Sequence, residues 1–243
     1  MVERVEVTGI VISSMPIGEV DKRVVILTKE FGKVSAFARG ARKPNSPFLA
    51  GSQPMAFGKF TLFPGRNSYS INNIKVSDYF ANDLTDPDKM YMGMYFLELA
   101  DYFAKEGLEA GEMLNLIYMA MKTLVKGDIP LTLIRRIYEF KMLVINGEYP
   151  DVFACGKCGS KENLDFFDLA HDCLVCENCH GALPETKKLK TSTVYALQYI
   201  VTSNMNKVFA FNVKEDILEQ LDNVIGSYIE KRVDKHFNSL EFL

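Results

Sequence analysis

The segment CGKCGSKENLDFFDLAHDCLVCENCH, residues 155–180, holds all five cysteines of a 243-residue chain and two of its three histidines. Two C-x2-C pairs that stand about 15 to 20 residues apart are typical of a tetrahedral zinc site with four thiolate ligands. Cys155 and Cys158 form the first pair. Cys158 is separated from Cys176 by 17 residues but from Cys173 by only 14. The spacing therefore favours CENC, which begins at Cys176, as the second pair.

We predict that one structural zinc ion per chain is bound by four cysteines, namely Cys155, Cys158, Cys176 and Cys179. A catalytic zinc keeps an open position for water, whereas four thiolates close the coordination shell. The metal would fold a small ribbon that could not stabilise itself. Sites with three cysteines and one histidine also occur, so His171 or His180 stays open as a replacement for one cysteine.

The first 80 residues have the pattern of short strands, rich in β-branched and aromatic residues and separated by Gly, Pro and Asn. The five segments are VEVTGIVI, KRVVILT, KVSAFARG, FGKFTLF and SYSINNIKV. Five strands in about 80 residues favour a small closed barrel over a sandwich, and the OB-fold is the five-stranded candidate. Its usual ligand is single-stranded nucleic acid.

The apolar pattern changes to a helical period from about residue 86, and three helices are expected before the cysteine segment. Two more are expected over about 191–203 and 213–235, with Asn212 and Glu215 as a capping box for the last one. The predicted fold is therefore α+β and multidomain, with the zinc ribbon inserted into a helical domain. The expected ranges are 1–80 for the barrel, 81–152 and 185–243 for the two parts of the helical domain, and 153–184 for the ribbon.

Charge is distributed unevenly along the chain. Residues 1–80 hold 11 Lys/Arg and 6 Asp/Glu, a net +5, and the remainder holds 17 and 25, a net -8. Residues 31–77 contain seven basic side chains and no acid. A segregated basic region indicates a polyanionic partner, although a solvated basic face without a partner is the plain alternative. The acidic helical half is expected to contact proteins rather than DNA.

Alternation in the strand KVSAFARG places Lys33, Ser35, Phe37 and Arg39 on one face, with small apolar residues on the other. An outward aromatic flanked by cations suits base stacking and phosphate neutralisation, unless Phe37 instead packs against the helical domain. The loop RGARKPNSPF adds further cations for phosphate contacts. The candidate nucleic-acid-binding residues are Lys22, Arg23, Lys33, Phe37, Arg39, Arg42, Lys43 and Arg66, and the family resemblance described below implies DNA as their ligand.

No sequence motif of a common enzyme class is visible. A Walker loop and the patterns G-x-S-x-G, H-E-x-x-H and G-x-G-x-x-G are all missing from the sequence. We therefore expect a binding protein without a catalytic residue. The first residues have no apolar signal region, and no uncharged apolar run is long enough to span a membrane, so we expect a cytoplasmic protein.

Several motifs in the same order make the chain resemble the RecO family of bacterial recombination-repair mediators. They are GEVDKRVVILTKEFGKVSAFARGARKPNS, FPGRNSYSI, LELADYF, FACGKCG, FDLAHDCLVCENC and KRVDKHFNSLEFL, which together run nearly end to end. The resemblance implies an OB-fold, a helical domain and a zinc ribbon. It also implies binding of single- and double-stranded DNA, annealing of complementary strands, and, with RecR, loading of RecA onto DNA coated by single-stranded-DNA-binding protein (SSB), in association with the nucleoid.

The resemblance carries the basic barrel residues and the four zinc cysteines over onto the positions named above. This chain departs from the family at Cys173, where Gly is usual, and at Ile17, where an aromatic is common. Two other readings remain. One is a single-stranded RNA-binding OB-fold protein with a structural zinc ribbon, and the other is a zinc or thiol enzyme with Cys173 as its nucleophile.

Overall fold

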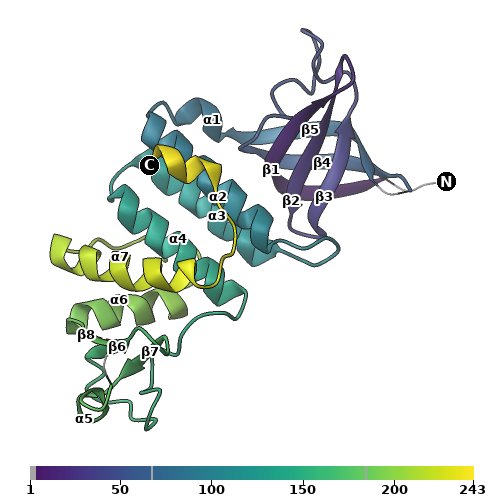
Figure 1. The fold of residues 1–243 in the computed structure, drawn as a ribbon. Coiled ribbons are helices and arrows are strands. Elements are labelled where there is room, and N and C mark those ends of the chain that lie inside the picture. Colours follow the sequence, from purple (N-terminus) through teal and green to yellow (C-terminus); the bar gives the residue numbers. More distant parts are fainter. Residues whose placement is uncertain (1–3, 67, 184) are drawn as a thin grey trace. The chain divides into compact units, whose positions relative to one another are not determined.

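Five strands close into a barrel at the N-terminal end of the chain (Figure 1). The computed structural model describes residues 4–66, 68–183 and 185–243. The strands are β1 (Val5–Ile17), β2 (Asp21–Thr28), β3 (Gly32–Ala38), β4 (Ala56–Pro64) and β5 (Tyr69–Tyr79). Their order around the barrel is β1-β2-β3-β5-β4, and all pairs are antiparallel except β3 with β5. The predicted five-stranded OB-fold is confirmed.

The barrel closes around a core of alternating residues. In β3, Val34, Ala36 and Ala38 are buried, whereas the residues between them are partly exposed. Val24 and Phe60 fill the same interior. The small alanines leave room for these larger neighbours, so the inward and outward faces follow the predicted alternation.

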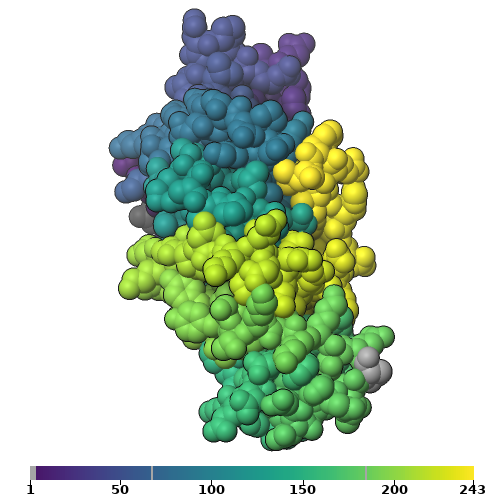
Figure 2. Space-filling view, turned by 90° about the vertical axis from the view of Figure 1, so that its left-hand side faces the viewer, coloured from purple at the N-terminus to yellow at the C-terminus, as the bar shows by residue number. Residues whose placement is uncertain are grey.

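Three helices and a C-terminal segment complete the first of two compact units, which comprises Met1–Gly127 and Phe237–Leu243. They are α1 (Phe80–Asp83), α2 (Pro87–Phe103), α3 (Gly111–Lys126) and the 3-10 turn η1 (Asn238–Phe242). The Asp86 side chain accepts a hydrogen bond from the backbone N–H of Asp88 and begins α2, with Pro87 in the first helical position. The η1 segment packs on α2, and Figure 2 shows it in yellow on the surface of these helices.

The second unit, Asp128–His236, combines three long helices and one short helix with a small sheet. The long helices are α4 (Leu131–Ile145), α6 (Thr191–Thr202) and α7 (Glu215–Glu230). Between α4 and α6 the chain forms β6 (Phe166–Asp168), β7 (Cys173–Val175), the short helix α5 (Glu177–His180) and β8 (Thr186–Lys188). The strand order is β7-β6-β8, with both pairs antiparallel. This segment is the ribbon that the sequence predicts between helices (Figure 1).

A buried charge joins α4 to α6 in the second unit. The ammonium of Lys141, on α4, donates to the carbonyl oxygens of Ile200, Val201 and Ser203 at 2.7–2.9 Å. These carbonyls belong to the C-terminal end of α6, where the helix has no partners of its own for them. A cation at this end is also favoured by the helix dipole. Lys141 therefore fixes where α6 ends.

Two local predictions for α7 are wrong. The helix begins after Lys214 without a side-chain cap, because the Asn212 side chain accepts from the N–H of Val213 instead of capping the helix. It ends at Glu230 rather than near residue 235. Beyond that end, Lys231 and Arg232 contact Asp172 of the ribbon, so the chain leaves the helical path, and His236 lies outside the helix.

Candidate functional site

Four cysteine sulfurs meet at one end of the ribbon. The Sγ atoms of Cys155, Cys158, Cys176 and Cys179 all lie within 4.8 Å of one another, and those of Cys158 and Cys176 are 3.7 Å apart. Four zinc–sulfur bonds of about 2.3 Å in a tetrahedron place neighbouring sulfurs about 3.8 Å apart. The arrangement therefore fits a four-thiolate metal site, and these are the four cysteines that the spacing favours.

Backbone hydrogen bonds build both halves of the cluster. In the first half, the N–H of Cys155 donates to the carbonyl of Ser160 at 2.7 Å, and the N–H of Gly159 donates back to Cys155 at 2.8 Å. Gly159 takes a positive φ of 74°, which a glycine adopts without strain. In the second half, the N–H of Cys179 donates to the carbonyl of Cys176 as the short helix α5 begins. Each C-x2-C pair is thus a tight turn that aims both sulfurs the same way.

The thiols differ in how readily they ionise. Burial opposes ionisation of Cys155, but the backbone N–H groups of Cys176, Cys158 and Lys157 lower the pKa of its thiol to about 6. Hydrogen bonding with the sulfurs of Cys158 and Cys176 raises the pKa of the Cys179 thiol to about 12. The first thiolate therefore forms easily and the last one does not, because hydrogen bonds with the sulfurs of Cys158 and Cys176 favour the neutral Cys179 thiol. A bound cation would remove this opposition, since it stabilises every thiolate around it.

Cys173 and the two nearby histidines lie outside this group of four. The Sγ of Cys173 packs against Gly156, where an added Cβ would come within 2.5 Å of it, and burial raises the pKa of its thiol. The His171 ring is hydrogen-bonded to the buried carboxylate of Asp168 at 2.7 Å. The His180 ring stacks on Phe166 with 3.8 Å between centroids. The side chains of both histidines are thus engaged elsewhere, which favours the four-cysteine set.

A group of exposed cations lies at the start of β2 and in the loop after β3. Arg23 pairs in register with Phe37, and its Nε donates to the Ser35 hydroxyl at 2.9 Å across the outer face. Arg39 and Lys43 are exposed on the loop after β3. Phe37 itself is only half-buried. This side of the barrel therefore offers guanidinium and ammonium groups beside an outward aromatic ring.

Arg42 connects this loop to the turn between β1 and β2. Its Nη1 donates to the carbonyls of Gly18 and Glu19 at 3.1 and 3.0 Å, and its side chain stays exposed. The N–H of Gly40 donates to the Asp21 carboxylate at 2.6 Å. The loop is thus held against the barrel, which fixes the positions of its cations.

Two candidate cations are placed differently from the rest. Lys22 is buried, and its burial together with the charge of Arg42 lowers the pKa of its ammonium. The ammonium of Lys33 donates to the backbone carbonyl and the carboxylate of Asp101 on α2 at 2.9 and 3.0 Å. These contacts make both lysines less available to a phosphate than the exposed Arg23, Arg39, Arg42 and Lys43.

Arg66 lies apart from this group, on the turn between β4 and β5. With Lys33, Ser35 and Tyr69 it lines a hollow of about 270 Å³ beside β3. Tyr69 was not singled out from the sequence, although it stands in the same FPGRNSYSI stretch as Arg66. The exposed Arg66 guanidinium and the Tyr69 ring suit a base with its phosphate, with Glu106 also in the lining, so Tyr69 joins the candidates.

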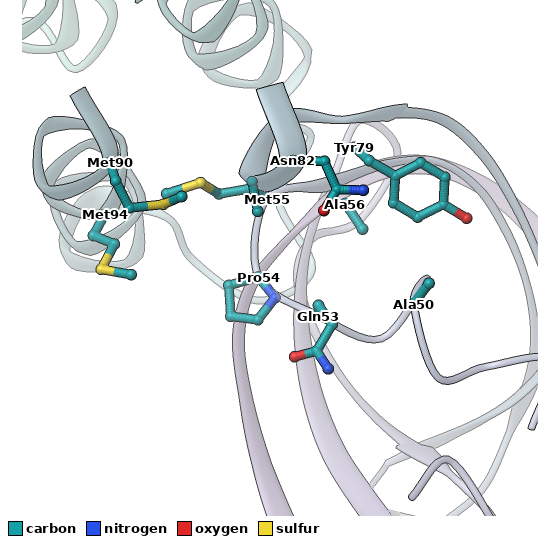
Figure 3. A pocket seen from close by; sticks show the side chains of 10 residues that line it. Ala50, Gln53, Pro54, Met55, Ala56, Tyr79, Asn82, Met90 and Met94 are labelled. Atoms are coloured by element: carbon teal, nitrogen blue, oxygen red, sulfur yellow. The ribbon is translucent and has the colours of Figure 1, made fainter. Parts of the chain in front are cut away.

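A second hollow of the first unit has a different character. It measures about 360 Å³, and Met55, Tyr79, Met90 and Met94 are among the residues that line it (Figure 3). None of its lining residues carries a charge. The hollow is therefore mainly apolar and offers no cation to a phosphate.

Comparison with known proteins covers nearly the entire chain. The family "Recombination protein O N terminal" matches residues 1–80, and "Recombination protein O C terminal" matches residues 84–241. A DNA repair protein RecO of Alkaliphilus metalliredigens is 31% identical over 239 residues, which cover 98% of this chain and 97% of that protein. A DNA repair protein RecO of Acetivibrio thermocellus is 32% identical over 241 residues, 97% of this chain and 94% of that protein. Within the described residues, no helix has both the length and the apolar character needed to cross a membrane.

Proposed function

The chain belongs to the Recombination protein O family of DNA repair proteins, and from that membership we propose that it is a recombination mediator without catalytic activity. It binds single- and double-stranded DNA and anneals complementary strands. Together with RecR it helps to load RecA onto single-stranded DNA that is coated by SSB, in association with the nucleoid.

The observation that carries this proposal is the group of exposed cations on the barrel. Arg23 pairs in register with Phe37, and Arg39, Arg42 and Lys43 lie on the loop after β3, which hydrogen bonds hold to the turn between β1 and β2. Exposed cations neutralise phosphates and release counterions whatever the base sequence, and an outward ring stacks on any base. Such a surface suits a protein that must act on DNA of any sequence.

The same surface gives a physical reason for annealing. Two complementary strands repel each other before they pair, because both are polyanions. Cations that neutralise part of each backbone lower this repulsion and let the bases meet. No bond is made or broken, so neither a nucleotide cofactor nor a catalytic residue is required.

The metal belongs to the scaffold in this proposal. Cys155, Cys158, Cys176 and Cys179 would hold one zinc ion, and four thiolates leave no position for a reactive water. The zinc would stabilise the ribbon, and the contacts to RecR and SSB would lie outside the cluster.

Strand annealing provides the test. Complementary oligonucleotides coated with SSB are mixed with the protein in the absence of ATP, and duplex formation is followed by fluorescence. We expect clear acceleration over the spontaneous rate. No acceleration would contradict the proposal, and stronger binding to RNA than to DNA of matched sequence would favour the RNA-binding alternative.

Charge reversal on the barrel tests where the DNA binds. The triple variant Arg39→Glu, Arg42→Glu, Lys43→Glu should lose at least about a hundredfold in affinity for single-stranded DNA, and its salt dependence should fall by about 2 in slope. Lys75→Glu reverses an exposed charge on β5 of the same barrel and is the matched control. An unchanged affinity of the triple variant would move the binding site elsewhere.

A further inference from the structure

A second acid-free stretch lies in the half of the chain with the negative net charge. Residues 186–214 contain five lysines and neither Asp nor Glu. The stretch spans β8, α6 and the segment that leads to α7. The net charge of -8 beyond residue 80 hides it, because Glu and Asp are concentrated elsewhere. The expectation that this half avoids DNA therefore does not apply to each of its surfaces.

Aromatic rings run along the outer side of α6. Val194, Leu197 and Ile200 are buried on the inner side of the helix. On the outer side, Tyr195 is 67% exposed, more than any other large hydrophobic side chain in the described part of the chain. Tyr199, one turn later, is half-buried. The two rings lie 6.5 Å apart between centroids, at an angle of 32°.

A third ring extends the row from the segment after α6. Phe211 meets Tyr199 edge-on at 5.1 Å. The Tyr199 hydroxyl donates to the backbone carbonyl of Lys207 at 2.9 Å, which holds the segment against the helix. Lys141 holds the end of α6 in turn. The row of rings is thus mounted on backbone that is fixed at several points.

Lysines precede and follow these rings along the chain. Lys187 precedes α6, and Lys207 and Lys214 lie on the segment that follows it. All three are exposed, and no carboxylate lies within ion-pair distance of them in the described part of the chain. Lys190 differs, because Asp216 of α7 neutralises it. Lys188 is exposed and lies 5.8 Å from the centre of the Phe166 ring.

We propose that this surface, formed by Tyr195, Tyr199, Phe211 and the lysines at 187, 207 and 214, is a second binding site for single-stranded nucleic acid. Bases stack on the exposed Tyr195 ring, and the lysines take the phosphates on either side. The 12-residue helix is about 18 Å long, enough to follow a few nucleotides. The inference rests on the proposed function, since it adds a second site to a DNA-binding protein.

The chemistry favours a nucleic acid over a protein as the occupant. An apolar protein partner would gain nothing from the unpaired lysines around the rings. A polyanion with flat rings is complementary to both features at once. With one site on the barrel and one on the second unit, a single molecule would hold two strands, which is what annealing needs.

Photocrosslinking of the full-length, zinc-loaded protein to single-stranded DNA that contains 5-iodouracil tests the site. We expect crosslinked peptides that carry Tyr195, in addition to peptides from the barrel. Crosslinks confined to the barrel would overturn the second site and leave the proposed function standing. The absence of any DNA binding would contradict the proposed function itself. Polyglutamate and unlabelled oligothymidine are then compared as competitors at matched charge. If both reduce the Tyr195 crosslink equally, the surface is assigned to acidic peptides instead.

Substitutions separate stacking from charge. Tyr195→Ala should lower the annealing rate about tenfold, and Tyr195→Phe should retain it because the ring remains. Lys207→Glu with Lys214→Glu should reduce the salt slope of binding by about 1. The matched controls are Tyr149→Ala, an exposed tyrosine between acids in the same unit, and Lys161→Glu in the ribbon. If the controls and the test variants have the same effect, the surface has no role in binding.

Discussion

The barrel and the ribbon are both small β structures, but different forces hold them together. The barrel has strands of 7 to 13 residues that hydrogen-bond around a closed ring, and its core residues Val24, Ile26 and Phe60 are fully buried. The ribbon has three strands of three residues each. Its few buried apolar residues include Phe167 and Leu174.

The difference shows how much apolar surface a β structure needs. A closed barrel removes its own edges and buries enough side chains to offset the conformational entropy of its strands. A nine-residue sheet cannot do so, and small structures of this kind are usually held by a metal or by disulfides. The metal site formed by the four sulfurs therefore provides the stability that an apolar core provides in a larger fold.

Removal of the metal should change the stability of the ribbon relative to the barrel more than any other perturbation described below. Binding of zinc to four thiolates contributes on the order of 10 kcal/mol or more to folding in small domains. Chelation, or Cys176→Ser, should abolish protection of the ribbon amides over about residues 155–188 in hydrogen exchange and leave the barrel amides protected. Cys173→Ser is the control and should keep one metal per chain. Ribbon amides that stay protected without metal would show that the ribbon folds on its own.

A cavity in the barrel core should have the next largest effect, and it should destabilise the barrel rather than the ribbon. Phe60→Ala removes a fully buried ring and should lower the free energy of unfolding by about 3–5 kcal/mol. Chemical denaturation measures this loss, and metal content should not change. The control is Phe63→Ala on the same strand, where the ring is exposed and the loss should stay below about 1 kcal/mol. Equal losses would mean that the barrel core is not what stabilises the barrel.

The link between the ribbon and α7 should have the smallest effect. Asp172 accepts from the Nζ of Lys231 and from Nη1 of Arg232, both at 3.0 Å. Asp172→Asn keeps a side chain that tolerates the positive φ of 53° but removes the charge. We expect a loss of about 0.5–1 kcal/mol at low salt that shrinks at high salt, measured by hydrogen exchange of the ribbon. Glu162→Gln, an exposed charge of the same ribbon, should have no such salt-dependent effect.

The sequence was sufficient where a local rule decides the structure. Alternation identified Val34, Ala36 and Ala38 as inward residues of β3, because side chains change face at every residue of a strand. Cysteine spacing selected the group of four over the pairing with Cys173, because the two C-x2-C pairs of a four-thiolate site stand about 15 to 20 residues apart. The fold class followed from these patterns.

Contacts between distant residues were beyond such rules. Lys33 faces outward as the alternation predicts, yet Asp101, 68 residues later, binds its ammonium. Lys22 is buried at the start of β2 despite its charge. The exposure of Tyr195 could not be predicted either, since apolar spacing alone does not reveal which helix faces will be covered by neighbouring elements. Each of these facts depends on tertiary packing, which one sequence does not contain.

The seat of the Lys141 ammonium has a practical consequence. The Lys141 ammonium donates hydrogen bonds to three carbonyls, and its side chain is buried within the second unit. An acylating reagent therefore reaches the amine only when α6 detaches. The rate at which Lys141 is acylated, compared with that of an exposed lysine such as Lys207, thus reports the free energy of this local opening. Acylation of Lys141 therefore measures how often α6, the helix that carries Tyr195, opens.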